Sequence, residues 1–411
     1  MVEPAKSGPR NVGFACEWTL LAVWVGFYPL IRLTRFSGNL VAKYAEGMFG
    51  MSDMLYIAMQ DGNQRKLSAC RIGVGGEVSV TFTSALGDGS NPPMSAVPWM
   101  TRARDKLYLT NWTTGDIAIW DIAEQNPKLV KSLSVGSNAA PSGLAVSPDG
   151  QTLYSANAPR NPRTGSVSAI RDLEGQNPSV LTATAPGPCE AVAVSPDGAY
   201  LYTTGYRFNG RKVIVWDVSD ATRPPQQVGS VDVGGANYIA YPDAARKEVY
   251  TAKNDIPGVV STVDVSDPEN PKCTTVLDLG EYNRRPTTLV PYPGGKFLLA
   301  SMYMSDCVGV INLLQKRVVA FIGIGTSQGA PIAVAVSSDG KKIYTANNNT
   351  DTAGSVTANV TELDVSELAP HWDSSGGAPD QPPNPVYQTG IISAKIETDL
   401  PPVGLVCARH G

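Results

Sequence analysis

The sequence predicts an all-β fold, a seven-bladed β-propeller of four-stranded blades. One short pattern recurs along the chain: an alternating apolar strand, a tight turn, and a pair of residues that ends in an aromatic or aliphatic side chain. It is clearest at residues 143–154, 191–202 and 332–344, with weaker copies that end at Tyr56, Tyr108, Tyr250 and Leu298. The seven copies recur at about 46 to 52 residues, which is the period of a propeller blade.

Each copy predicts its own strands. In the fourth copy Ala191 and Ala193 alternate with Val192 and Val194, a period of two that is typical of an inner strand. Pro-Asp-Gly or Ser-Asp-Gly follows and predicts a hairpin turn into the second strand. The third strand ends in an aliphatic-Asp-aliphatic step, and we interpret these residues as turn formers because Asp bonds its own backbone two residues on. They are Asp121, Asp172, Asp217, Asp264 and Asp364, with Asn312 in the sixth copy.

Length and composition leave room for one propeller. Of the 411 residues we assign 1–44 to an N-terminal extension and 45–411 to the propeller. Forty Gly, 32 Pro and 17% charged residues suit short strands joined by many turns. A net charge of −4 disfavours a nucleic-acid partner, since phosphate binding calls for a basic excess. We expect a monomer or a weak homodimer.

The ring is expected to be closed by a terminal strand, and two segments could complete the first blade. Residues 45–50 precede Tyr56 much as an inner strand would, whereas residues 402–407 resemble the start of the inner strand at 141–146. A C-terminal strand in the first blade would remove its open edge. Cys407 would then lie near the start of the chain, where a disulfide to Cys16 or Cys70 would make the closure covalent.

The compartment is inferred from three features. The apolar run Thr19–Ile31 fits a signal-peptide core or a buried extra strand, and it is too short for a membrane anchor. Six cysteines without close metal-type spacing permit disulfides. Three Asn-x-Thr sequons begin at Asn111, Asn348 and Asn359. We therefore expect a secretory-pathway or extracellular glycoprotein, with a cytoplasmic location as the open alternative.

Two phrases of the chain carry a family resemblance. Ala-Val-Ser-Pro-Asp-Gly-x-x-Leu-Tyr-x-x-Asn at 145–157 and Val-x-Val-x-Asp-Val at 213–218 resemble the YVTN-type repeats of lactonase-like propellers. That superfamily includes phosphogluconolactonase-like proteins, carboxymuconate cycloisomerases and repeats without enzymatic activity. The resemblance therefore implies the fold more firmly than the function. WD40 repeats are less similar, because their Gly-His signature is missing.

The small number of histidines limits the catalytic and metal-binding roles that this residue type can have here. The chain has two histidines, His371 and His410, and neither lies on a predicted channel strand. This disfavours a channel histidine as general acid or base and a histidine-ligated metal. No phosphate loop, dinucleotide fingerprint or nucleophile elbow is found, so we expect no metal and no redox cofactor.

The channel mouth is the expected site, because loops positioned by a rigid ring carry function in propellers. Glu190 precedes an inner strand where we align Ser142, Tyr238, Thr287 and Ile332 in other blades. Burial would raise the pKa of the Glu190 carboxyl and suit it to proton transfer. The alternative interpretation is a salt bridge to an arginine of a neighbouring loop. The predicted catalytic residues are Glu190, Arg207, Arg285, Tyr206 and Tyr303.

Positive and aromatic residues share the same rim. Arg forks and Tyr hydroxyls would hold a carboxylate, an enolate or a polarised carbonyl. The alternative to ligand binding is that the arginines are solvated surface residues and that the asparagines form turns. The predicted substrate-binding residues are Asn157, Arg160, Asn237, Tyr238, Lys253, Tyr282 and Asn347.

These residues predict an enzyme that acts on a small anionic or carbonyl-rich molecule. Lactonase, isomerase or cyclase chemistry all fit, and a cycloaddition in secondary metabolism would depend on shape and hydrogen-bond polarisation without Glu190. The alternative is a non-catalytic propeller that binds a ligand or a protein loop at the same mouth.

Overall fold

The computed structural model describes most of the chain from residue 53 onward. The described residues are 53–61, 64–72, 78–85, 100–112, 114–124, 126–136, 139–159, 164–175, 177–205, 211–240, 245–279, 285–303, 305–325, 330–350, 356–373, 387–388, 392–397 and 402–409. The predicted extension, residues 1–44, lies outside them. None of the helices in this part of the chain is long and apolar enough to cross a membrane.

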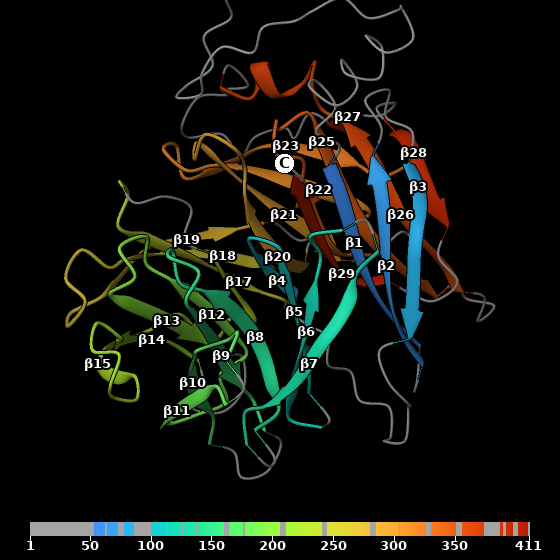
Figure 1. The fold of residues 1–411 in the computed structure, drawn as a ribbon. Coiled ribbons are helices and arrows are strands. Elements are labelled where there is room, and N and C mark those ends of the chain that lie inside the picture. Colours follow the sequence, from blue (N-terminus) through green and yellow to red (C-terminus); the bar gives the residue numbers. More distant parts are fainter. Residues whose placement is uncertain are drawn as a thin grey trace, which may run out of the picture. The chain divides into compact units, whose positions relative to one another are not determined.

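The strands form seven sheets, which we call blades 1 to 7 in chain order (Figure 1). Blade 1 contains β1 (Asp53–Asp61), β2 (Gln64–Ile72), β3 (Val78–Ala85) and the C-terminal β29 (Pro402–Arg409). Blade 2 contains β4 (Met100–Ala103), β5 (Lys106–Asn111), β6 (Asp116–Asp121) and β7 (Lys128–Ser134). Blade 3 contains β8 (Pro141–Val146), β9 (Thr152–Asn157), β10 (Ser166–Arg171) and β11 (Ser179–Thr184). Blade 4 contains β12 (Ala191–Val194), β13 (Tyr200–Thr204), β14 (Lys212–Asp217) and β15 (Gln226–Asp232).

Blades 5 to 7 complete the fold. Blade 5 contains β16 (Tyr238–Ala240), β17 (Glu248–Lys253), β18 (Val259–Asp264) and β19 (Lys272–Asp278). Blade 6 contains β20 (Arg285–Pro291), β21 (Phe297–Tyr303), β22 (Cys307–Asn312), β23 (Arg317–Gly323) and β27 (Tyr387–Gln388). Blade 7 contains β24 (Pro331–Val336), β25 (Lys342–Thr350), β26 (Val356–Asp364) and β28 (Ile392–Glu397). A short 3-10 helix, η2 (Ala369–His371), follows β26. The predicted all-β seven-bladed propeller is confirmed, with mostly four-stranded blades; blade 6 has a fifth strand.

The inner strands β4, β8, β12, β16, β20 and β24 contact one another in succession. Each leads from what we call the mouth end of the propeller to a hairpin turn at the opposite end, which we call the turn end. At the turn end of blade 4, the Ser195 hydroxyl accepts the Tyr200 N–H at 2.9 Å, and Gly198 adopts a φ of 74°. Glycine is favoured there because a Cβ is strained at positive φ. Gly150 and Gly340 repeat this geometry in blades 3 and 7.

The Asp residues that end the third strands act as predicted. A side-chain oxygen of Asp121, Asp217, Asp264 or Asp364 accepts the N–H of the residue two positions later, at 2.8 to 3.0 Å. Asn312 does the same toward Leu314. Asp172 differs: Arg171 occupies the strand-end position in blade 3, and Asp172 follows it with a φ of 55°. Local side-chain bonding therefore shapes most of these turns.

The hydrophobic core consists of separate clusters, each in the interface between two neighbouring blades. We call each of these interfaces a seam. Within the described residues, seven buried clusters each join two neighbouring blades, including blades 7 and 1. The residue after each turn-forming Asp or Asn enters the seam, for example Val218 between blades 3 and 4 and Leu313 between blades 5 and 6. Blade-to-blade packing is therefore the main source of stability in this fold.

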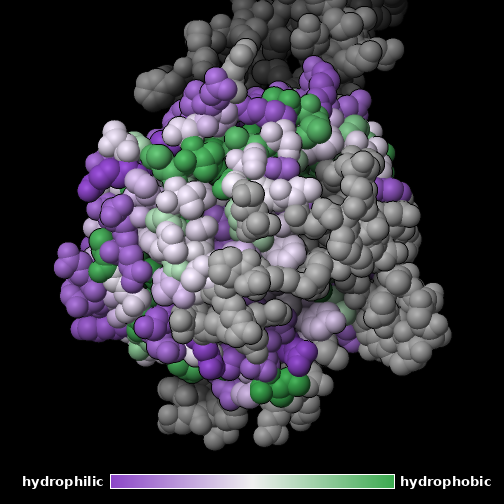
Figure 2. Space-filling view, turned by 90° about the horizontal axis from the view of Figure 1, so that it is seen from below, coloured by the Kyte–Doolittle hydropathy of each residue, from purple (hydrophilic) through white to green (hydrophobic). Residues whose placement is uncertain are grey.

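The outer strands show the opposite pattern. β19 alternates exposed and half-buried residues, β7 is mostly exposed, and β11 has no buried residue. Figure 2 shows hydrophilic residues around smaller hydrophobic areas on the face that it displays. β23 is the exception, because its five central residues are all buried and β27 pairs with it in parallel at Phe321 and Ile322.

β29 pairs with β1 in an antiparallel register that sets Cys407 opposite Leu55 (Figure 1). Cys70 of β2 lies opposite Leu55 on the other side. Cys407 and Cys70 are thus two strand spacings apart, about 9 to 10 Å, which exceeds the Cα separation of a disulfide. Cys70, Cys189, Cys273 and Cys307 are free thiols, so the expected disulfides are wrong for the described cysteines. A bond from Cys16 lies outside the described residues.

Candidate functional site

The candidate site lies at the mouth end, where inner strands begin and second strands end. Glu190, Asn237, Tyr238, Arg285 and Tyr303 lie there on blades 4, 5 and 6, and we call them the mouth residues. β12, β16 and β20 are neighbouring inner strands. The structure therefore places five of the predicted site residues on three adjacent blades.

Glu190 and Asn237 occupy the same position in their blades. The Glu190 N–H donates to the Thr204 carbonyl at 2.8 Å, and the Asn237 N–H donates to the Ala252 carbonyl at 2.9 Å. The alignment of Tyr238 with Glu190 is therefore wrong by one residue. Blade 5 lacks the Ser-Pro-Asp-Gly turn that sets the register in blades 3 and 4. The Asn237 amide donates to the Glu190 carboxylate at 2.7 Å, which links blades 4 and 5.

Burial sets the protonation state of two groups near Glu190. Burial raises the pKa of the Tyr238 hydroxyl, and the negative charge of Glu190 raises this pKa further. Tyr238 therefore remains a hydrogen-bond donor at neutral pH. Burial also raises the pKa of the Cys189 thiol to about 12. A thiol with such a pKa is protonated at neutral pH, so Cys189 does not suit nucleophilic catalysis.

The backbone beside Glu190 is closely packed. A Cβ at Gly143 of β8 would lie 2.8 Å from the Ala191 Cα and 2.9 Å from the Glu190 carbonyl oxygen. Only a glycine permits this approach of β8 to β12. The main chain that carries Glu190 is thus held from two sides, by β13 within its blade and by β8 of blade 3.

Arg285 and Tyr303 form a cross-strand pair. They lie directly opposite each other at the mouth ends of β20 and β21, and both are half-buried. The next residues of β20 tie blade 6 to blade 7: the Thr287 hydroxyl donates to the Pro331 carbonyl at 3.2 Å, and the Thr288 hydroxyl donates to the Ile332 carbonyl at 2.8 Å. A cation and a phenol are therefore held together on a fixed strand pair.

Lys253 ends β17 and forms an ion pair with Asp255 at 3.3 Å. Its side chain is partly exposed, so it remains a predicted ligand group at the rim of blade 5.

Asn157 and Asn347 are fully buried within blades 3 and 7. The Asn157 amide donates to the hydroxyls of Ser166 and Ser168 at 3.0 and 2.9 Å. The Asn347 amide donates to Asn359 and Thr361, both at 2.8 Å. These contacts join neighbouring strands inside each blade and are not the turn bonds of the alternative interpretation. We do not include either residue in the proposed site.

Four predicted site residues lie outside the described residues: Arg207, Tyr206, Arg160 and Tyr282. Their roles stay predictions. In the part of the chain that the structure describes, no three His, Cys, Asp or Glu side chains gather closely enough to hold a metal ion.

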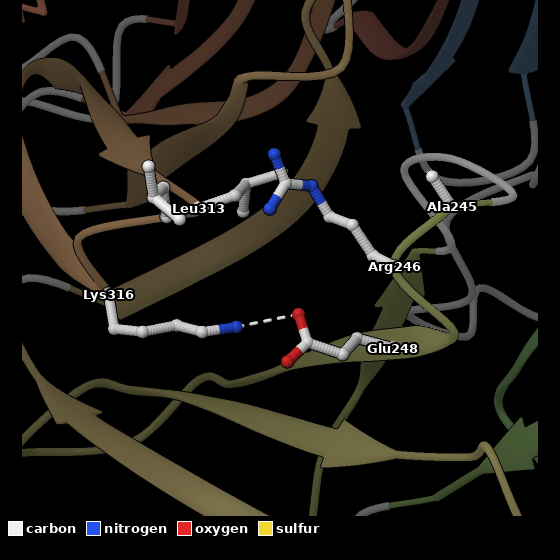
Figure 3. Close-up of a pocket in the computed structure, with 6 residues that line it drawn as sticks. Ala245, Arg246, Glu248, Leu313 and Lys316 are labelled. Atoms are coloured by element: carbon white, nitrogen blue, oxygen red, sulfur yellow. Dashed lines mark hydrogen bonds and ion pairs between the residues drawn. The ribbon is translucent and has the colours of Figure 1, made fainter.

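The sequence did not predict a hollow at the turn end between blades 5 and 6. It has a volume of about 440 Å³ and is lined by Ala245, Arg246, Glu248, Leu313, Leu314 and Lys316 (Figure 3). Lys316 forms an ion pair with Glu248 at 2.6 Å. The missing Ser-Pro-Asp-Gly phrase in blade 5 and the short turn at residues 313–316 are the signals that could have indicated it.

No protein-family model matches this chain, and no curated protein matches it in sequence. Solved structures do match. The periplasmic gluconolactonase of Pseudomonas aeruginosa has a TM-score of 0.64 at 17% identity, over 88% of this chain and 99% of that one. A proposed 6-phosphogluconolactonase of Bacteroides fragilis has a TM-score of 0.61 at 16% identity, over the same shares of the two chains. Hydrazine synthase of Kuenenia stuttgartiensis has a TM-score of 0.60 at 18% identity, over 76% and 92%.

Identities this low show the fold alone. They confirm that the chain is a seven-bladed propeller structurally similar to the lactonase-like propellers.

Proposed function

We propose that this lactonase-like propeller is an enzyme that binds a small anionic or carbonyl-rich molecule at its mouth end. The reaction is a proton transfer coupled to lactone opening, isomerisation or cyclisation. The observation that carries the proposal is the Glu190 carboxylate, held at 2.7 Å by Asn237 beside a protonated Tyr238. A fixed carboxylate within electrostatic reach of a half-buried phenol is an arrangement that suits general acid-base catalysis.

Lactone opening gives the residues definite roles. Glu190 accepts a proton from the water that attacks the carbonyl carbon, and it returns a proton to the ring oxygen that leaves. Arg285 binds the anionic or carbonyl oxygen of the substrate, and Tyr303 donates a hydrogen bond beside it. Arg207 and Tyr206 of the neighbouring loop remain proposed partners in the same site. The gluconolactonase names of two similar structures make sugar lactones the first substrates to test.

The test is consumption of substrate by purified protein. Sugar lactones and small keto and enol acids would be incubated with wild type, Glu190→Gln and Arg285→Gln, and each compound would be followed by NMR. Arg223→Gln on an exposed turn of blade 4 is the matched control. We expect turnover to fall about 100-fold or more in Glu190→Gln and Arg285→Gln, because each loses a charge that acts on the substrate. Thermal melting should stay close to that of wild type.

Other outcomes would contradict the proposal. Loss of melting temperature in Glu190→Gln without loss of turnover would assign the Glu190–Asn237 bond to joining blades 4 and 5. A compound retained at one equivalent and never consumed would favour the second candidate, a ligand-binding propeller that uses the same mouth.

We also propose that β29 closes the ring. Its support is the antiparallel register with β1 and the contacts of β29 with β24 and β4. A shared sheet of this kind would join the two ends of the described chain in one blade.

A further inference from the structure

The backbone that leads to Glu190 is bonded to two different blades. The Cys189 N–H donates to the Asn157 carbonyl of blade 3 at 3.2 Å, and the Glu190 N–H donates to the Thr204 carbonyl of blade 4 at 2.8 Å. β9, which ends at Asn157, contacts the inner strand β12 that follows Glu190. The position of the Glu190 main chain therefore depends on where the end of β9 lies.

The side chain of Asn157 fixes the end of β9 inside blade 3. Its amide oxygen accepts the Ser155 hydroxyl at 2.8 Å, and its amide nitrogen donates to the Ser166 and Ser168 hydroxyls at 3.0 and 2.9 Å. The Ser168 hydroxyl also bonds the Thr182 hydroxyl at 2.9 Å, so the network reaches from β9 through β10 to β11. We call these bonds the amide network. A buried polar network whose members are all satisfied makes its surroundings rigid.

The next seam has the same backbone bond without the amide network. Gly205 is the equivalent of Asn157 in blade 4, since each lies five residues after the residue that opposes the end of the third strand. The Ala236 N–H donates to the Gly205 carbonyl at 3.2 Å. The backbone bond between blades therefore does not require an asparagine. In blade 3 the asparagine adds an anchor to the bond that holds the segment before Glu190.

Gly165 of blade 3 encloses this bond. A Cβ at Gly165 would lie 2.6 Å from the Cys189 nitrogen and 2.8 Å from the Asn157 carbonyl oxygen, and it would also clash with the Gly187 carbonyl oxygen. A glycine permits this close approach of the backbone. Gly187 and Cys189 are buried as a result, while Glu190 is half-buried at the mouth end.

We propose that Asn157 is a positioning residue for Glu190. Its side chain holds the end of β9 in place, and its carbonyl holds the Cys189 N–H, so that the Glu190 carboxylate meets the Asn237 amide at 2.7 Å. Asn157 is fully buried and does not touch the substrate in this role. The catalytic consequence rests on the proposed function, whereas the hold on the segment before Glu190 can be measured without a substrate.

Cys189 reports on this hold. Its thiol is 1% exposed, and its Sγ lies 3.7 Å from the Gly187 carbonyl oxygen and 3.7 Å from the Thr203 hydroxyl oxygen. A thiol reagent reaches Cys189 only when the segment opens locally or the protein unfolds. Cys70 and Cys307 are buried free thiols in blades 1 and 6, and global unfolding exposes them as well. The labelling rate of Cys189 relative to these two reference thiols therefore measures local opening.

The test labels the full chain with iodoacetamide at mildly alkaline pH and follows each cysteine by mass spectrometry. Asn157→Ala removes the amide network. Ser168→Ala removes one of its bonds and is the milder variant if Asn157→Ala does not fold. Asn347→Ala is the matched control, because the Asn347 amide also donates two buried hydrogen bonds, in blade 7, which is not a neighbour of blade 4.

We expect the relative labelling rate of Cys189 to rise about tenfold or more in Asn157→Ala, because several buried hydrogen bonds that oppose opening are lost. Ser168→Ala should give a smaller rise, and Asn347→Ala should give none. The inference is overturned if Cys189 is labelled no faster in Asn157→Ala than in Asn347→Ala.

Turnover is the second measurement, with a compound that the wild type converts. In Asn157→Ala we expect kcat to fall about tenfold with little change in KM, because the base is misplaced while the substrate contacts remain. Thr361→Ala, which loses a buried hydrogen bond in blade 7, should keep both values. An equal fall of kcat in the two variants would also overturn the inference. Unchanged turnover in Glu190→Gln would instead contradict the proposed function, and the labelling comparison would still decide whether Asn157 holds the segment.

Discussion

The single residue that most affects the candidate site is Asn237, because it fixes the Glu190 carboxylate from a neighbouring blade. The sequence identified both residues as site candidates but aligned Tyr238 with Glu190. A strand has a side-chain period of two, so a slip of one residue assigns a side chain to the wrong face. Blade 5 carries Ala240-Tyr241-Pro242 where blades 3 and 4 carry Val-Ser-Pro-Asp-Gly, so the register of its inner strand could not be aligned from that phrase.

Gly143→Ala is expected to destabilise the propeller by about 1 to 3 kcal/mol, because the new methyl would overpack against Ala191 and the Glu190 carbonyl. Urea unfolding measures this cost. Turnover should fall as well, since the main chain at Glu190 must shift. Ser142→Ala on the same strand is the control and should change stability little. Equal stability of Gly143→Ala and wild type would mean that β8 and β12 are not held at this distance.

At the scale of elements, the turns after the third strands were the most predictable part of the sequence. Most of them are decided by bonds between residues two positions apart, such as Asp217 with Ser219. The hollow between blades 5 and 6 was not predictable in this way. It depends on two turns, near Arg246 and Leu314, that are distant in sequence and meet only when the blades pack.

The same turns predict a loss of stability in acid. Burial opposes ionisation of Asp364, but hydrogen bonds from Ser366 and Lys342 outweigh it and hold the pKa of Asp364 at about 2. Because this pKa is depressed on folding, the stabilisation is present above about pH 4 and is lost as pH falls toward 2. We expect a contribution of about 1 kcal/mol, allowing for solvent screening of a partly exposed carboxylate.

Unfolding free energies of wild type and Asp364→Asn, measured at pH 7 and pH 3, check this prediction. The two proteins should differ most at pH 7 and converge in acid. Glu367→Gln, an exposed acid on the same turn, is the control. A difference that stays constant with pH would show that the charge of Asp364 does not contribute.

At the scale of the whole molecule, the repeat period was enough to predict the number and type of blades. Copies of one phrase bury their apolar faces against each other, so seven copies lead to seven seams. The order of strands in blade 1 could not be predicted from the repeat, because two segments of the sequence fitted its inner strand equally well.

Deletion of residues 402–411 tests the proposed closure. It would remove β29 and leave β1 without its partner, and we expect a loss on the order of 5 kcal/mol from several backbone hydrogen bonds. Urea unfolding followed by circular dichroism measures the loss, with deletion of Gly411 alone as the control. A truncated chain as stable as the control would show that β29 is not needed to close the ring.

The fifth strand of blade 6 has a consequence for the protein in concentrated solution. Outer strands such as β7 and β19 each expose a lysine, Lys128 and Lys272, and exposed charges discourage edge-to-edge pairing between molecules. β23 has five buried apolar central residues, so a bare edge on this strand would be suited to template aggregation. β27 pairs with it at Phe321 and Ile322, so the chain itself occupies part of the edge that a second molecule would otherwise extend.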